Sequence, residues 1–141
     1  MRAICIGNAP CSWGALEFAD VKSGRLGFTR MLDELVESGY TGSELGDWGF
    51  MPTEPERLAE EFRSRSLDLT GAFIGIALRN PAAHTPGLEE ALKVAGLVSH
   101  TAALLTQDAE PFLVLADDNG TDPVRTGNAG RITQDQGLTA A

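Results

Sequence analysis

The stretch Pro111-Phe-Leu-Val-Leu-Ala-Asp117-Asp118-Asn119-Gly120 decides the fold class. An apolar run of strand length breaks here into acidic and amide side chains, followed by a glycine. This pattern is typical of the carboxyl end of a buried parallel strand, where α/β proteins place their ligand-binding loops. We therefore expect an α/β fold with a strand at residues 112–116. Asp117, Asp118 and Asn119 then face a ligand.

Upstream of this stretch, apolar runs of strand length alternate with helical patterns. In the first helix, Phe28, Met31, Leu32, Leu35 and Val36 follow the spacing of one buried stripe. Strict alternation implies parallel strands joined by right-handed crossovers. We expect strands at 3–7, 40–45, 67–76 and 112–116, and helices at 27–38, 53–65 and 87–105.

The helix at 53–65 has a start signal of its own. Thr53 is in the N-cap position, Pro55 lies in the first turn, and Glu56 stands three residues after Thr53 to complete a capping box. Residues 80–86 are expected to form a loop before the next helix.

Four strand–helix units suggest part of a barrel. A closed (βα)8 barrel needs roughly 200 to 400 residues, so the 141 residues of this chain correspond to about half of one. We expect residues 1–120 to form a partial TIM barrel and residues 121–141, which lack periodicity, to form an irregular loop or tail. A doubly wound, flavodoxin-like sheet is the alternative, because about four such units could also build it.

Charge and composition narrow the partners. There are 11 Lys and Arg residues against 20 Asp and Glu, a net charge of −9, which argues against nucleic acid as a partner because phosphate binding requires clustered basic residues. The first apolar stretch is too short for a signal peptide, and no run approaches the length of a membrane span. Cys5 and Cys11 match no zinc or redox spacing. We expect a reduced, cytoplasmic location with no membrane contact.

Several motifs of known chemistry are absent from the sequence. The dinucleotide-binding GxGxxG, the P-loop and the GxSxG nucleophile elbow do not occur. A calcium loop aligned on Gly120 would have Leu115 and Thr126 at its first and last ligand positions, where carboxylates are required. His84 and His100 have no second ligand at metal-binding spacing. No metal site is predicted in this chain, and no catalytic residue is assigned.

Polar and aromatic side chains at the expected strand ends form the candidate site. The carboxyl ends of parallel strands meet on one face, where carboxylates can bind sugar hydroxyls and an indole offers a flat apolar surface. The alternative is that these residues shape turns and fill core. We predict substrate contacts from Trp13, Glu44, Asp47, Trp48, Asp117, Asp118 and Asn119.

Three segments together resemble a known family. They are Ile6-Gly-Asn-Ala-Pro-Cys-Ser-Trp-Gly14, Tyr40-Thr-Gly-Ser-Glu-Leu-Gly-Asp-Trp-Gly-Phe50 and Phe112-Leu-Val-Leu-Ala-Asp-Asp-Asn-Gly120. The chain resembles the N-terminal half of the sugar phosphate isomerase/epimerase family, the xylose isomerase-like TIM barrels, over residues 3–131. The first segment is the most distinctive and is similar to the inosose dehydratase-like branch. The Gly-x-Glu-Leu pattern at 42–45 recurs across the wider family.

The resemblance implies a function in carbohydrate metabolism, including inositol metabolism. Such enzymes are close to twice this length and bind one divalent metal, manganese, cobalt or zinc, through Glu, Asp and His side chains on later strands. The metal polarises a carbonyl and stabilises an enediolate while acidic residues move protons. No position of this sequence matches those ligands. The resemblance therefore implies a truncated or split isomerase, epimerase or dehydratase (a lyase) that is inactive alone.

Two expectations about partners follow. The ligand would be a sugar or cyclitol. The strands at 3–7 and 112–116 are short, apolar and uncharged, so their open edges favour self-association or pairing with a missing C-terminal half. The alternative function is a non-catalytic module that binds a polyol or pairs with a partner.

Overall fold

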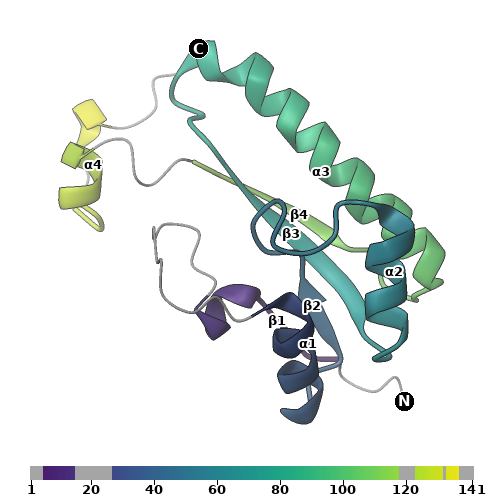
Figure 1. Cartoon of the computed structure of the whole chain (residues 1–141). Helices are drawn as coiled ribbons and strands as arrows, with labels where there is room; N and C mark the ends of the chain where they lie inside the picture. The colour runs from purple at the N-terminus through teal and green to yellow at the C-terminus, as the bar shows by residue number, and fades with distance from the viewer. Residues whose placement is uncertain (1–4, 15–26, 118–122, 132, 137–141) are drawn as a thin grey trace.

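The fold is α/β, with a four-stranded parallel sheet in a computed structural model that describes residues 5–14, 27–117, 123–131 and 133–136. The strands lie in chain order (Figure 1). They are β1 (Gly7–Asn8), β2 (Gly42–Glu44), β3 (Asp68–Ile76) and β4 (Phe112–Asp117). Between them run α1 (Phe28–Glu37), α2 (Pro55–Arg63) and α3 (His84–Leu105). The expected alternation of strands and helices is confirmed.

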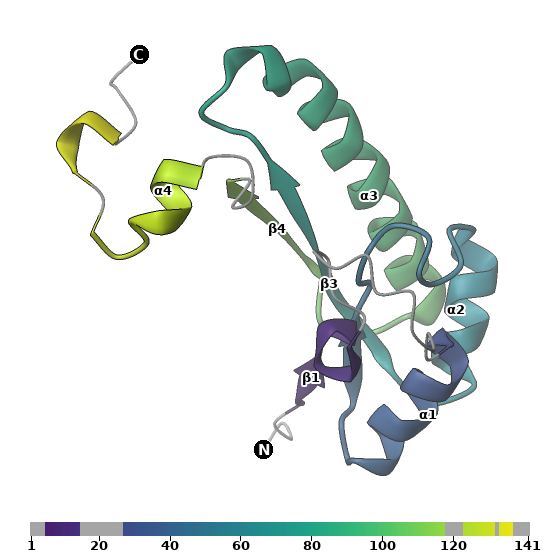
Figure 2. The ribbon, with the colours of Figure 1, turned by 60° about the vertical axis from the view of Figure 1, so that its left-hand side comes forward.

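The three long helices cover one face of the sheet. Figure 2 shows α1, α2 and α3 on the same side of the strands. A flavodoxin-like sheet reverses its strand order and binds its ligand at the point of reversal. The described strands run β1-β2-β3-β4 without a reversal, so they do not support the doubly wound alternative.

The core lies between the helices and this face of the sheet. Three residues of the predicted α1 stripe, Met31, Leu32 and Leu35, are fully buried, whereas Val36 is exposed. Burying such side chains removes about 25 cal/mol of unfavourable hydration per Å² of apolar surface. The other main contributors are Leu58 and Phe62 of α2, Leu69, Ala72 and Ile74 of β3, and Val94, Leu97 and Val98 of α3.

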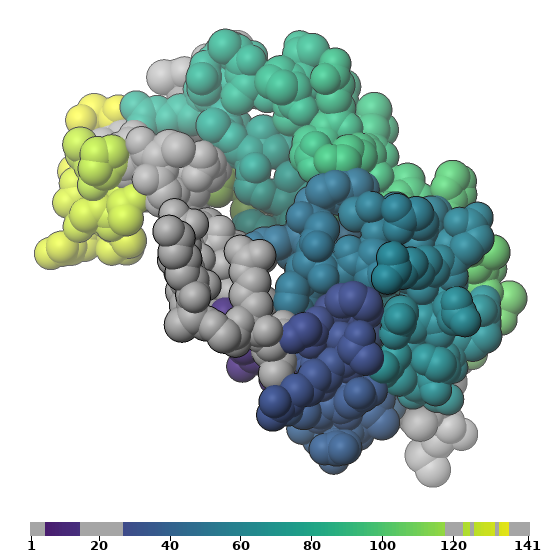
Figure 3. Space-filling view, viewed as in Figure 1, coloured from purple at the N-terminus to yellow at the C-terminus, as the bar shows by residue number. Residues whose placement is uncertain are grey.

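An arginine strengthens the helical layer. Arg65, just after α2, donates from Nε to Asp33 Oδ1 of α1 at 2.6 Å and from Nη1 to Glu61 Oε2 at 2.8 Å. In the space-filling view, α1 and α2 form one continuous surface (Figure 3). α1 and α2 therefore form one packed layer on this side of the sheet.

A side-chain amide extends the sheet where β4 has not yet begun. Gln107 Oε1 accepts a hydrogen bond from the Leu69 N–H at 3.0 Å, and its Nε2 donates to the Leu69 carbonyl at 2.9 Å. Backbone pairing of β3 with β4 begins only at Gly71 and Phe112. Gln107 thus satisfies backbone groups of β3 that would otherwise be buried without partners.

Some predicted boundaries are wrong. The N-cap of α2 is Glu54, because Pro55 occupies the first helical position. No side-chain cap forms there, and the capping box of Thr53 and Glu56 is absent. α3 starts at His84, before Pro86, because a first-turn proline needs no backbone N–H. β2 has three residues where 40–45 was expected. Residues 3 and 4 of the first predicted strand lie outside the described residues.

The segment after β4 is not wholly irregular. It contains α4 (Pro123–Gly127), a helix of five residues that starts at a proline, and a 3-10 turn at Gln134–Gln136. None of the helices in the described ranges is both long enough and apolar enough to cross a membrane.

Candidate functional site

The carboxyl ends of β1 and β2 lie side by side. Gly7 pairs with Gly42 and Asn8 with Ser43. Asn8 Oδ1 accepts hydrogen bonds from the Ala9 N–H and the Ser12 hydroxyl, both at 2.8 Å. The Asn8 side chain therefore shapes the 3-10 turn at Pro10–Trp13, which follows β1.

Glu44 ends β2 on the face of the sheet that carries no helix. Its neighbour Ser43 is fully buried beside Leu69 in the core, and successive strand residues point to opposite faces. Glu44 is half-buried, and within the described residues its carboxylate has no hydrogen-bond or ion-pair partner. A carboxylate in this position is available to accept hydrogen bonds from a ligand.

The loop after β2 presents Asp47 and Trp48. The Phe50 N–H donates to the Asp47 carbonyl at 3.0 Å and Gly49 has φ +87°, which is the geometry of a turn with glycine at its third position. Trp48 is 40% exposed and so does not fill core. Asp47 lies at the surface, yet neighbouring protein atoms limit its hydration and raise its pKa above the usual value. We refer to Glu44, Asp47 and Trp48 as the β2-end cluster.

Trp13 has a different environment. Its Nε1–H donates to Glu34 Oε2 of α1 at 3.1 Å, and Glu34 Oε1 also accepts from Arg30 Nε at 2.8 Å. The ring meets Tyr40 edge to face, with centroids 6.3 Å apart. These contacts tie the loop after β1 to α1, so Trp13 packs against the helical layer.

Asp117 and His84 both contact the backbone of Leu78, just after the end of β3. Asp117 Oδ1 accepts from the Leu78 N–H at 3.0 Å, and the Leu78 carbonyl lies 2.8 Å from His84 Nε2. Sequence spacing does not mark His84 as a site residue, because it does not indicate that the loop after β3 folds back onto β4. Asp118 and Asn119, also predicted to contact substrate, lie outside the described residues.

The strand ends do not all meet at one point. Glu44 is level with Gly71 of β3, whereas Asp117 is level with Ile76, five residues further along the strand. At ~3.3 Å per residue, this offset is about 16 Å along the sheet. The structure therefore places Glu44, Asp47 and Trp48 at and just after the end of β2, and Asp117 with His84 beyond the end of β3. In the part of the chain that the structure describes, no three His, Cys, Asp or Glu side chains form a group that could bind a metal ion.

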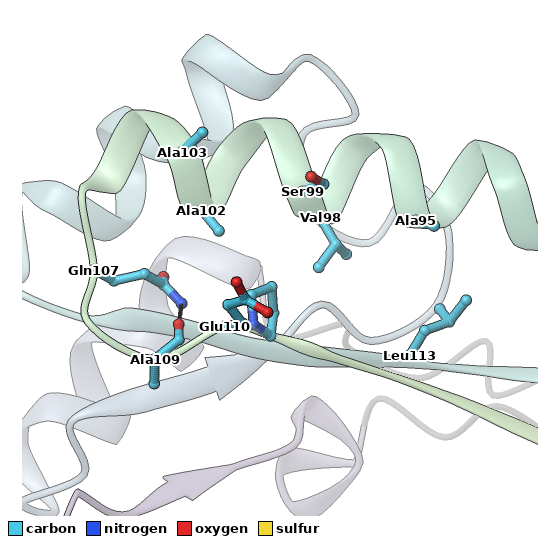
Figure 4. Close-up of a pocket in the computed structure, with 10 residues that line it drawn as sticks. Ala95, Val98, Ser99, Ala102, Ala103, Gln107, Ala109, Glu110 and Leu113 are labelled. Carbon is cyan, nitrogen blue, oxygen red and sulfur yellow. Dashed lines mark hydrogen bonds between the residues drawn. The ribbon is translucent and has the colours of Figure 1, made fainter.

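A cavity of about 490 Å³ lies between α3 and the start of β4 (Figure 4). Its walls are mostly small or apolar side chains of α3 and β4, among them Ala95, Val98, Ala102, Ala103 and Leu113. The Gln107 amide at its rim is already bonded to Leu69. The cavity opens at the amino end of β4, whereas α/β proteins bind ligands at the carboxyl ends of their strands.

No protein-family model matches the chain, and no curated protein matches it either. The functional assignment therefore depends on the residues themselves and on the geometry described above.

Proposed function

We propose that this chain is the polyol-contacting, N-terminal half of a sugar or cyclitol isomerase, epimerase or dehydratase with a xylose isomerase-like barrel. The observation that carries the proposal is Glu44, at the carboxyl end of β2 on the face without helices, with no partner for its carboxylate among the described residues. The one-sided helical layer and the strand order support the barrel assignment, since a barrel wall is built in this way.

The β2-end cluster has the chemistry of a polyol site. The Glu44 carboxylate can accept hydrogen bonds from adjacent hydroxyls, and the Trp48 indole offers a flat surface for the C–H side of a ring. Asp47, whose pKa is raised above its usual value by limited hydration, is the second carboxylate of the cluster. These residues bind and orient a ligand.

The described residues do not fit the divalent metal that the family resemblance implies. Carboxylate ligands must lie about 2.0–2.6 Å from a common ion, and Glu44 and Asp117 are offset by five residues along β3. We therefore derive no step through a metal and assign this chain a binding role. Proton transfer next to a carbonyl requires an electrophile worth several kcal/mol, so the chain alone should show no isomerase, epimerase or dehydratase turnover.

The proposal is tested by titrating the chain with myo-inositol and recording its ¹⁵N–¹H spectra at each concentration. We expect concentration-dependent shifts confined to the amides of Glu44–Trp48 and the Trp48 indole N–H. Glu44→Gln keeps the side-chain shape but removes the charge, and it should weaken binding about tenfold, since a hydrogen bond to a charged group contributes roughly 1.5–3 kcal/mol.

Glu37→Gln is the matched control. Glu37 is exposed at the last residue of α1, so this variant makes the same change of charge away from the cluster and should bind as the native chain does. Equal weakening in both variants, or shifts that lie around the α3–β4 cavity, would refute the assignment of the site.

One observation favours a second function, that of a partner-pairing module. Among the described strands β4 lies at the edge of the sheet, and its side chains Phe112, Val114 and Leu115 are 75%, 47% and 51% exposed. Exposed apolar edge strands pair readily with other strands. This function does not exclude polyol binding, because the β4 edge and the β2-end cluster are separate.

A further inference from the structure

The loop after β2 is held to α3 by a contact between residues far apart in the chain. Lys93 Nζ lies 3.9 Å from the centroid of the Trp48 ring. The same ammonium lies 3.0 Å from both Oε1 and Oε2 of Glu90, three residues earlier on α3. Tryptophan is the aromatic side chain that attracts a cation most strongly.

This contact lies at the part of the loop that has least other support. Leu45 and Met51, at the two ends of the loop, are each only 3% exposed and belong to the core. Trp48 is at the tip, inside the turn closed by Phe50 and Asp47. The ends are thus fixed by burial, and the indole at the tip is positioned by the ammonium of Lys93.

We propose that Lys93, held by Glu90, is a positioning residue that fixes the Trp48 indole, which is 40% exposed, in an orientation from which it can stack on a ligand. A cation over one face of an aromatic ring restricts the ring to orientations that keep that contact. The Glu90 carboxylate in turn restricts where the ammonium can lie. The identity of the ligand rests on the proposed function, whereas the positioning of the ring does not.

The positioning is tested by quenching of Trp48 fluorescence with acrylamide. The sequence contains two tryptophans, so Trp13→Phe leaves Trp48 as the single emitter. In that background, Lys93→Met keeps the length of the side chain and removes its charge. We expect the quenching constant to rise about twofold, because the released ring becomes more accessible when the cation–π contact is lost. Lys93→Arg preserves the charge and stacks on aromatic rings, so it should quench as the native side chain does.

Trp13 packs against α1, and Trp13→Phe changes that packing. A second measurement therefore uses the chain with Trp13 in place. The Trp48 indole N–H signal in ¹⁵N–¹H spectra of the otherwise native chain should move in Lys93→Met and stay in place in Lys93→Arg. The Trp13 indole signal, which reports on the Glu34 hydrogen bond, should not move in either variant. Unchanged quenching together with an unchanged Trp48 signal in Lys93→Met would overturn the positioning role.

A titration with myo-inositol separates this proposal from the proposed function. We expect Lys93→Met to bind severalfold more weakly and Lys93→Arg to bind as the native chain does. Equal binding by all three chains would overturn the role of the fixed indole in ligand stacking. If the native chain binds no inositol while quenching still depends on Lys93, the proposed function fails and the positioning of Trp48 by Lys93 is supported.

Discussion

Replacing Gly71 with alanine should break the pairing of β3 with β4 and cost about 3 kcal/mol of stability, near the upper end of the range for overpacked sites. Gly71 is buried and pairs with Phe112. A Cβ at this position would collide with the backbone carbonyl oxygen of Phe112. The same Cβ would lie only 3.2 Å from the carbonyl carbon and 3.3 Å from the backbone nitrogen of Phe112. Backbone atoms of a paired strand cannot rotate away as a side chain can, so the strands would have to separate.

Gly75→Ala provides a control in the same strand. A Cβ there would meet only Phe73 Cε1, at 3.9 Å, an ordinary contact. Gly75 is exposed, and alanine reduces the freedom of the unfolded chain, so we expect a change of less than about 1 kcal/mol. Urea unfolding followed by circular dichroism measures both variants. Equal stabilities would show that β3 and β4 are not paired in this register.

The second large effect concerns self-association through β4. We expect the 141-residue chain to self-associate at tens of micromolar, because β4 has exposed apolar side chains and an outer edge that pairs with no other described strand. Val114→Lys places a charge in the middle of this edge, a device by which natural edge strands avoid pairing. The variant should shift the chain to a monomer in size-exclusion chromatography with light scattering.

Val36→Lys tests whether the effect belongs to the edge. Val36 lies on α1 and is 39% exposed, close to the 47% of Val114, so the two variants replace similarly exposed valines. Val36→Lys should associate as the native chain does. A native chain that is monomeric and folds cooperatively at these concentrations would contradict the prediction, as would equal effects of both variants.

The strands and helices that could be predicted are those whose residue pattern lies within one short segment of the sequence. The apolar run at 112–116 is β4, with Asp117 added, because its length and the turn residues on either side are those of a strand. The run also predicted a buried strand, which is wrong, since Phe112, Val114 and Leu115 are exposed. The α1 stripe predicted Met31, Leu32 and Leu35 in the core from spacing alone. Val36 is exposed because it lies at the edge of that stripe, where the helical layer ends.

The arrangement of the candidate site could not be predicted in the same way. Glu44, Asp117 and Trp48 were each identified at a strand end. Their separation depends on the register of β2 and β4 against β3, which includes an irregularity between Ser43 and Glu44. The contact of Trp48 with Lys93 depends on where the loop after β2 crosses α3. Register and loop paths are set by packing between distant segments, which spacing along the chain does not report.

We expect this chain to supply polyol contacts, and its described residues form no metal centre. The most direct test is a titration of the chain with Mn²⁺ in which the electron paramagnetic resonance signal of the free ion is measured. The five-residue offset between Glu44 and Asp117 predicts a free-ion signal that rises in proportion to added Mn²⁺, as it does in buffer, up to about 100 μM, because separated carboxylates cannot share one ion. A single stoichiometric site of micromolar affinity that is lost in Glu44→Gln would contradict the claim.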